Sequence, residues 1–204
     1  MDNNKQIDFQ ECMDAAMQGD PEAQYQLALC YETGDGVEAD ADKAFEWYKK
    51  AAEQGVVEAQ NSLGCCYYNG EGTPQDYGKA AQWFKQAAQQ NHSYAQYHYA
   101  LCFLYGTGVT PNYEEARAWL IKAAEQGNSE AKQLLESQRK EKQRNIRKDG
   151  LKEIIIGAVV LSVGLIITLL TYRSVSDSGG RYIIAWGAML SGAILMIKGV
   201  IDVL

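Results

Sequence analysis

Basic residues are scarce in the first part of this 204-residue sequence. Residues 1–128 contain 8 Lys and Arg against 19 Asp and Glu, a net charge of −11, whereas residues 129–204 contain 11 against 7, a net charge of +4. Non-specific binding to nucleic acids requires clustered cations that displace counterions from phosphates, so the acidic part is poorly suited to it. A neutral or basic protein is a better-matched partner.

Groups that serve catalysis or metal binding are also few. The two histidines, His92 and His98, share no helical face, and no carboxylate or cysteine completes a ligand set around them. No pair of carboxylates stands isolated in apolar sequence, where a shifted pKa would serve acid–base chemistry. We therefore expect no active site, metal or cofactor. A hydrolase is the disfavoured alternative, and substrate turnover by the purified repeats would revive it.

A period of 36 residues runs through the first part of the chain. It is carried by columns of alanine, tryptophan and glycine: Ala23, Ala59, Ala95 and Ala131; Ala16, Ala52, Ala88 and Ala124; Trp47, Trp83 and Trp119; Gly34, Gly70 and Gly106. Within each unit, small and aromatic residues recur at helical spacing, which predicts two short amphipathic helices, A and B. One such pair cannot bury its apolar face alone, so the units are expected to stack into an all-α solenoid.

The repeat boundaries follow from this period. We place an N-terminal capping helix at 1–20, repeats at 21–56, 57–92 and 93–128, and a capping and basic juxtamembrane helix at 129–150. Four polar residues are expected as helix N-caps, namely Asp20, Asp40, Asp76 and Asn112. The glycine column at Gly34 is expected to end helix A in the left-handed conformation. The tryptophan column at Trp83 is interpreted as interhelix packing.

The five cysteines show no disulfide or metal-site pattern. Cys30, Cys66 and Cys102 fall one per repeat in a single column, whereas a disulfide needs Cα atoms closer than ~7 Å. Neither Cys65 nor Cys12 adds the spacing of a metal ligand. We expect reduced thiols that act as small apolar packing residues.

The motifs within each unit resemble a known family. The pattern EAQxxL, YxxGxGV and DxxKAxxWYxxAAxxG, which begins at Glu22 and recurs with variations from Glu58 and Tyr94, is similar to the Sel-one-like repeat, a relative of the tetratricopeptide repeat. The resemblance covers about 128 of the 204 residues and implies a right-handed α/α solenoid that scaffolds protein complexes. Asn91 departs from the pattern because it replaces the glycine that closes helix B.

The third helix A is unusually aromatic, with four tyrosines and one histidine between Tyr94 and Tyr105. Tyrosine offers a large contact area at low entropic cost. In the alternative interpretation, most of these residues pack against the neighbouring repeat. One column that the core periodicity leaves free is expected to line a groove. The predicted partner-binding residues are Tyr25, Asn61, Tyr94, Tyr97 and His98.

Two apolar runs follow the repeats. Ile154 to Tyr172 is a run of 19 residues without a charge, which at ~1.5 Å per residue reaches about 28 Å, the thickness of a bilayer core. A polar stretch at 173–181 separates it from the second run. We expect a transmembrane hairpin with helices at about 152–172 and 182–203.

The flanking charges predict the orientation of this hairpin. Seven basic residues precede the first run and two lie between the runs, which places the repeats and both termini in the cytoplasm, with the bacterial inner membrane as the expected location. Residues 1–10 lack the features of a signal peptide. This cluster of basic residues also has the charge that anionic lipids attract, so it can serve as a topology signal, as a lipid-binding site or as both. Its members nearest the span are Arg144, Arg147, Lys148 and Lys152.

These patterns predict a non-catalytic, membrane-anchored adaptor whose cytosolic repeats bind a protein or peptide partner. The alternative is an accessory subunit of a transporter or envelope complex, in which the hairpin is the working part and the repeats are its cytosolic handle.

Overall fold

The computed structural model describes the backbone of residues 9–178, with side chains through residue 166 and at Leu169. The chain divides into two units, Met1–Leu135 and Glu136–Leu204. Within the described range, the regular secondary structure consists of eight helices.

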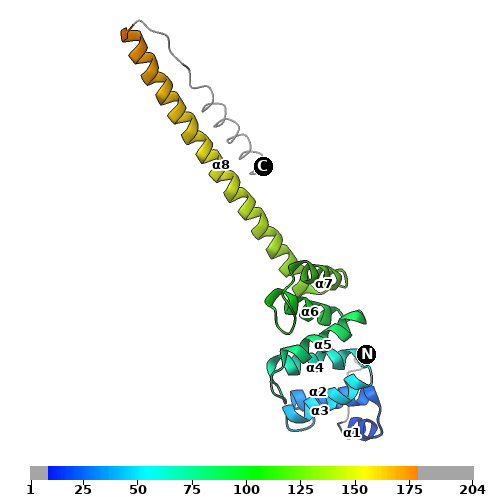
Figure 1. The fold of residues 1–204 in the computed structure, drawn as a ribbon. Coiled ribbons are helices and arrows are strands. Elements are labelled where there is room, and N and C mark those ends of the chain that lie inside the picture. The colour runs from blue at the N-terminus through cyan, green and yellow to red at the C-terminus, as the bar shows by residue number, and fades with distance from the viewer. Residues whose placement is uncertain (1–8, 179–204) are drawn as a thin grey trace. The chain divides into compact units, whose positions relative to one another are not determined.

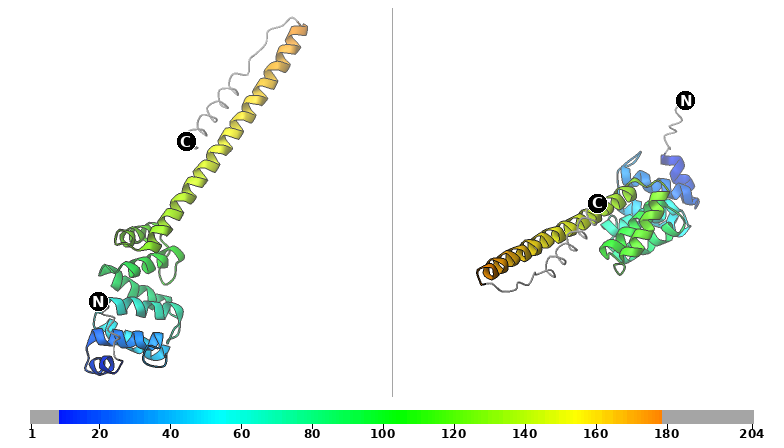
Figure 2. Two further views of the ribbon diagram at one scale, coloured as in Figure 1. Left: turned by 180° about the vertical axis from the view of Figure 1, so that it is seen from behind. Right: turned by 90° about the horizontal axis from the view of Figure 1, so that it is seen from above.

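The first unit is a stack of short helices that follow one another in chain order (Figures 1 and 2). They are α1 (Phe9–Met17), α2 (Pro21–Thr33), α3 (Ala41–Glu53), α4 (Val57–Asn69), α5 (Tyr77–Gln89), α6 (Ser93–Tyr105), α7 (Tyr113–Glu125) and the start of α8 (Ser129–Ser178). From α1 to α7, each helix packs against the next. Helices α2, α4 and α6 are the A helices, and α3, α5 and α7 are the B helices. The predicted all-α repeat solenoid is therefore confirmed.

Local capping explains where these helices begin and end. The four predicted N-caps each accept hydrogen bonds from first-turn backbone N–H groups: Asp20, Asp40, Asp76 and Asn112. Each A helix ends at a left-handed glycine: Gly34, Gly70 and Gly106. Asn91, with φ of 65°, takes the place of the glycine that follows the other B helices. Asparagine tolerates this conformation, so the departure from the repeat pattern leaves the turn intact.

The core position of the B helices lies one residue beyond the tryptophan column. Trp47 is buried, but Trp83 and Trp119 are half-buried, so the prediction that this column fills the interhelix space is only partly right. The residues that follow are 0–2% exposed: Tyr48, Phe84 and Leu120. A shift of one residue rotates a side chain by about 100° around the helix, which separates the core from its edge.

A ladder of buried glutamines, which the sequence analysis missed, joins successive helices. Each buried glutamine donates from Nε2 to an alanine carbonyl of the preceding helix and accepts at 2.8 Å from a glutamine that follows the next helix. The buried members are Gln24, Gln60 and Gln96, and their donors are Gln54, Gln90 and Gln126. Because both columns recur every 36 residues, the sequence did contain a signal for them.

Helix α8 is 50 residues long and continues into the second unit. The sequence predicts separate helices before and after residue 150 and a loop at 173–181, whereas the structure has one helix to Ser178. Residues 129–178 contain no proline, and an interior glycine such as Gly150 costs only ~1 kcal/mol, so nothing forces a break. In the described residues, no helix combines the length and the apolar character needed to cross a membrane. The second predicted span, 182–203, lies outside the described residues.

Candidate partner-binding groove

A pocket of about 250 Å³ lies between the A helices α4 and α6, above the intervening helix α5. We call it the apolar pocket, and it is lined by Cys65, Tyr68, Asn69, Phe84, Tyr97, His98 and Leu101. Phe84 is nearly fully buried, whereas most of the other side chains are half-buried and present one face to solvent. The A helices therefore carry a hollow lined mainly by aromatic and apolar groups, and aromatic residues are enriched in protein interfaces.

Phe84 forms the floor of the apolar pocket, and it fits there because Gly64 has no side chain. A Cβ atom added to Gly64 of α4 would lie 2.6 Å from Cδ1 of Phe84, so the phenyl ring packs directly against the α4 backbone. From α6, the ring of His98 contacts Phe84, with ring centroids 4.9 Å apart. The floor is therefore built by residues of three consecutive helices.

His98 lines the apolar pocket and contacts side chains of both A helices, α4 and α6. Its Nδ1 lies 3.1 Å from Oδ1 of Asn61 and 3.9 Å from Sγ of Cys65, and its ring lies 5.7 Å from that of Tyr97. Burial, reinforced by the nearby His92, lowers the pKa of His98 to about 4. At neutral pH the imidazole is therefore uncharged, and Nδ1–H donates to Asn61. It contributes an aromatic surface to the pocket rather than a positive charge.

Two of the five predicted binding residues, Tyr97 and His98, line the apolar pocket, and a third, Asn61, contacts His98 but is not part of the lining. Tyr25 lies one repeat earlier, half-buried, with its ring 5.9 Å from Tyr48. Tyr94 is 51% exposed and stands beside His92, away from the pocket lining. The packing of His98 fits the alternative interpretation, in which residues of this helix contact the neighbouring repeat.

Sequence reasoning missed Cys65, Tyr68 and Leu101, which also line the pocket. A signal was present, because Cys65 and Leu101 follow Asn61 and Tyr97 by four residues and therefore lie on the same helical faces. The missing information was that the pocket extends a full turn along each A helix.

The cysteine column packs as predicted. Cys30, Cys66 and Cys102 are all buried, and Cys66 and Cys102 belong to the apolar core. Burial, together with the nearby Glu32, raises the pKa of the Cys66 thiol to about 12. Thiols of this kind are protonated and unreactive at neutral pH. Among the described residues, no group of three or more His, Cys, Asp or Glu side chains is placed to hold a metal ion.

Paired helices that stack one on the next in chain order define a helical-repeat solenoid. Residues 21–56, 57–92 and 93–128 each match the Sel1 repeat. The chain therefore belongs to the Sel1 repeat family, as the sequence motifs indicated.

Three solved structures are similar to this chain. A Sel1 repeat protein from Oxalobacter formigenes shares 40% identity at a TM-score of 0.57, over 62% of this chain and 37% of its own. A protective antigen of uropathogenic Escherichia coli with an SLR fold shares 26% identity at a TM-score of 0.62, over 94% and 48%. Cysteine rich protein B from Helicobacter pylori, at 22% identity and a TM-score of 0.51 over 62% and 96%, shares the fold. This chain thus spans less than half the length of the first two.

A comparison with curated proteins gave no match. Proteins of the Sel1 repeat family typically act as scaffolds for protein interactions and are generally not catalytic.

Proposed function

We propose that this chain is a non-catalytic adaptor whose repeats bind a protein partner through the groove formed by α4 and α6. The observation that carries the proposal is the apolar pocket, where Tyr97, Tyr68 and Leu101 leave apolar surface open above a closed core. Half-buried aromatic residues around a hollow are the usual anchors of a protein interface. The function of its family and the net charge of −11 over residues 1–128 support the same role.

Capture of the partner tests this proposal. The full chain, purified in mild detergent from its native cells, is expected to retain a protein that is lost when residues 21–128 are deleted. Tyr97→Ala is expected to reduce capture about tenfold, the effect of losing ~1.4 kcal/mol of binding energy. Quantitative mass spectrometry of the captured protein provides the measurement.

Tyr105→Ala is the matched control for this experiment. It removes a tyrosine from the same helix, but Tyr105 is 68% exposed and does not line the pocket. Tyr97 is half-buried, so its removal should lower the melting temperature slightly, but both variants should remain folded at the temperature of the capture experiment, as circular dichroism would check. Equal capture by the two variants would remove the pocket from the interface. A partner that survives deletion of the repeats would contradict the adaptor role itself.

We also propose that residues 151–204 attach the repeats to a membrane as a hairpin. Support comes from the uncharged run Ile154–Tyr172 and from the exposure of large apolar side chains in α8. Seven of these, between 49% and 62% exposed, are Ile155, Ile156, Val159, Val163, Leu165, Ile166 and Leu169. Apolar surface on this scale is unstable in water unless a bilayer or another protein covers it.

Cysteine labelling tests the proposed topology. A cysteine introduced at Ser178 should react with a membrane-impermeant maleimide added to intact cells, whereas one at Ser137 should react only after lysis. The parent chain, with its five native cysteines, is the background control. Labelling of the Ser137 variant alone in intact cells would place the repeats on the opposite side and overturn the proposed orientation.

The alternative function, in which the hairpin is the working part of a transporter or envelope complex, makes a different prediction. If the repeats are the functional unit, a chimera that carries residues 1–135 on an unrelated membrane anchor should retain the partner. If the hairpin is the working part, the chimera should lose it.

A further inference from the structure

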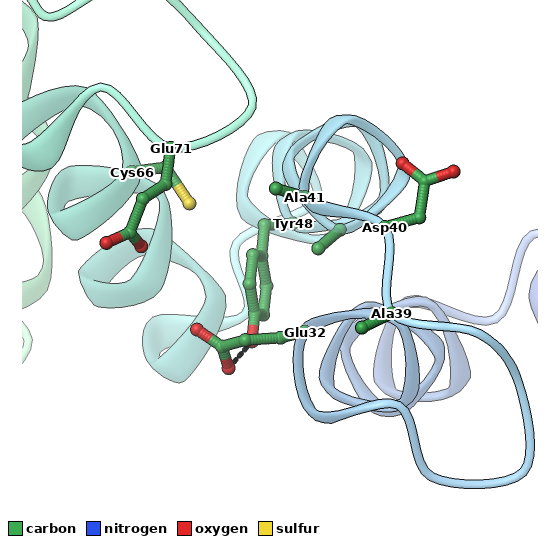
Figure 3. Close-up of a pocket in the computed structure, with 8 residues that line it drawn as sticks. Glu32, Ala39, Asp40, Ala41, Tyr48, Cys66 and Glu71 are labelled. Carbon is green, nitrogen blue, oxygen red and sulfur yellow. Dashed lines mark hydrogen bonds between the residues drawn. The ribbon is translucent and has the colours of Figure 1, made fainter.

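A second pocket, of about 360 Å³, opens between the first and second repeats (Figure 3). We call it the acidic pocket, and it is lined by Glu32, Ala39, Asp40, Ala41, Ala44, Tyr48, Cys66 and Glu71. Figure 3 shows Glu32 and Glu71 entering from different repeats, with Tyr48 between the alanine-lined side and Cys66. Three carboxylates therefore border a cavity whose remaining walls are small or aromatic.

The carboxylates of this pocket are oriented, and two of them lack a counterion. The hydroxyl of Tyr48, a fully buried side chain, donates to Oε2 of Glu32 at 2.7 Å and fixes its direction. Asp40 pairs with Lys43 at 2.9 Å. No ion pair within the described residues involves Glu32 or Glu71, and the hydrogen bond from Asn69 to Glu71 leaves its charge in place.

The fold itself does not require this polar arrangement. One repeat further along, the position of Glu32 is Tyr68, that of Tyr48 is Phe84, and that of Glu71 is Thr107. The second interrepeat space is therefore built without Glu32 and Glu71, and its pocket is apolar. Asp40 recurs as Asp76, but Glu32 and Glu71 have no acidic equivalents one repeat further along. The repeat architecture therefore does not explain these two carboxylates, whereas binding of a cation would.

The two pockets meet at the C-terminal end of α4. Asn69, which lines the apolar pocket, donates a hydrogen bond at 3.1 Å to Glu71, which lines the acidic pocket. The pockets share two columns of the repeat, because Glu32 and Tyr48 in the acidic pocket correspond to Tyr68 and Phe84 in the apolar pocket. A single extended segment that crosses α4 can therefore contact both.

We infer that the groove binds a peptide segment in which a Lys or Arg side chain enters the acidic pocket and a large apolar side chain enters the apolar pocket. This rests on the proposed partner-binding function and names the chemistry of the partner. Glu32 and Glu71 supply charge complementarity for the cation, while the alanines and Tyr48 contact its aliphatic stem. Phe84, Tyr97 and Leu101 surround the apolar side chain.

Selection from a library of short random peptides, displayed on phage and bound to the immobilised full chain in detergent, tests the inference. The expected consensus contains a basic residue and an aromatic or large aliphatic residue at a fixed separation. Glu32→Gln with Glu71→Gln should weaken binding of a fluorescein-labelled consensus peptide about tenfold, the scale of two partly solvated ion pairs. The Gln side chain can still accept from Tyr48, so the fold should persist.

Two controls make the outcome specific. Glu46→Gln with Glu53→Gln removes the same charge from exposed positions that line neither pocket, and it should leave peptide affinity unchanged. Leu101→Gln should weaken the preference for the apolar residue but keep that for the basic one.

A consensus without a basic residue, or equal affinities for the two double variants, would overturn the inference but leave partner capture by the repeats untouched. A selection that enriches no peptide would show that the groove does not bind linear segments. Loss of the cellular partner on deletion of residues 21–128 tests the adaptor function independently, so the two failures can be told apart.

Discussion

Gly108→Ala is expected to destabilise the repeats by about 2–5 kcal/mol, because two separate costs add. Gly108 has φ of +75°, and the left-handed conformation costs an L-residue ~1–2 kcal/mol. A Cβ atom there would also overlap the Tyr77 carbonyl and lie 3.0 Å from the Gly78 nitrogen. Overpacking against rigid backbone adds about 1–3 kcal/mol. Urea unfolding followed by tryptophan fluorescence measures the change.

Gly55→Ala is the control that separates the conformational cost of the left-handed backbone from the steric cost of the added Cβ atom. Gly55 has φ of +96°, but nothing lies within 4 Å of the position that its Cβ would take. Its substitution should therefore show only the conformational cost, about 1–2 kcal/mol. Equal destabilisation by the two variants would mean that the loop after α6 does not press against the start of α5.

Phe84→Ala is expected to cost about 3–5 kcal/mol, the range for truncating a large buried aromatic side chain. Phe84 is 2% exposed and packs between Gly64 of α4 and His98 of α6, so its loss opens a cavity at the junction of three helices. Because Phe84 also forms the floor of the apolar pocket, the variant should lose partner capture as well. Urea unfolding gives the change in stability.

Trp83→Ala is the adjacent control, since it removes a larger side chain that is only half-buried. We expect a cost of about 1–2 kcal/mol, in proportion to the smaller apolar area that leaves water. If Trp83→Ala proved more destabilising than Phe84→Ala, the tryptophan column would be the core position and the helix register described above would be wrong.

The sequence by itself determined the repeat architecture, because the signals involved are local and recur every 36 residues. Asp76 caps α5 through atoms three residues away, and Gly70 ends α4 by its own backbone freedom. Such features depend on neighbours in the chain, so they can be predicted without knowing the fold. Repetition in three copies then favours a solenoid, because stacking each unit on its neighbour buries the apolar faces that a single unit leaves exposed.

Only the tertiary structure decided which side chains meet across repeats. Glu32 and Glu71 are far apart in the sequence, and no periodicity relates them, yet they border one cavity. His98 looks like a surface residue by composition, but contact with Phe84 and Asn61 makes it part of the packing. Burial, pocket shape and the charge inside a pocket depend on how one helix is rotated against the next, and a rotation of one residue is enough to exchange core and groove.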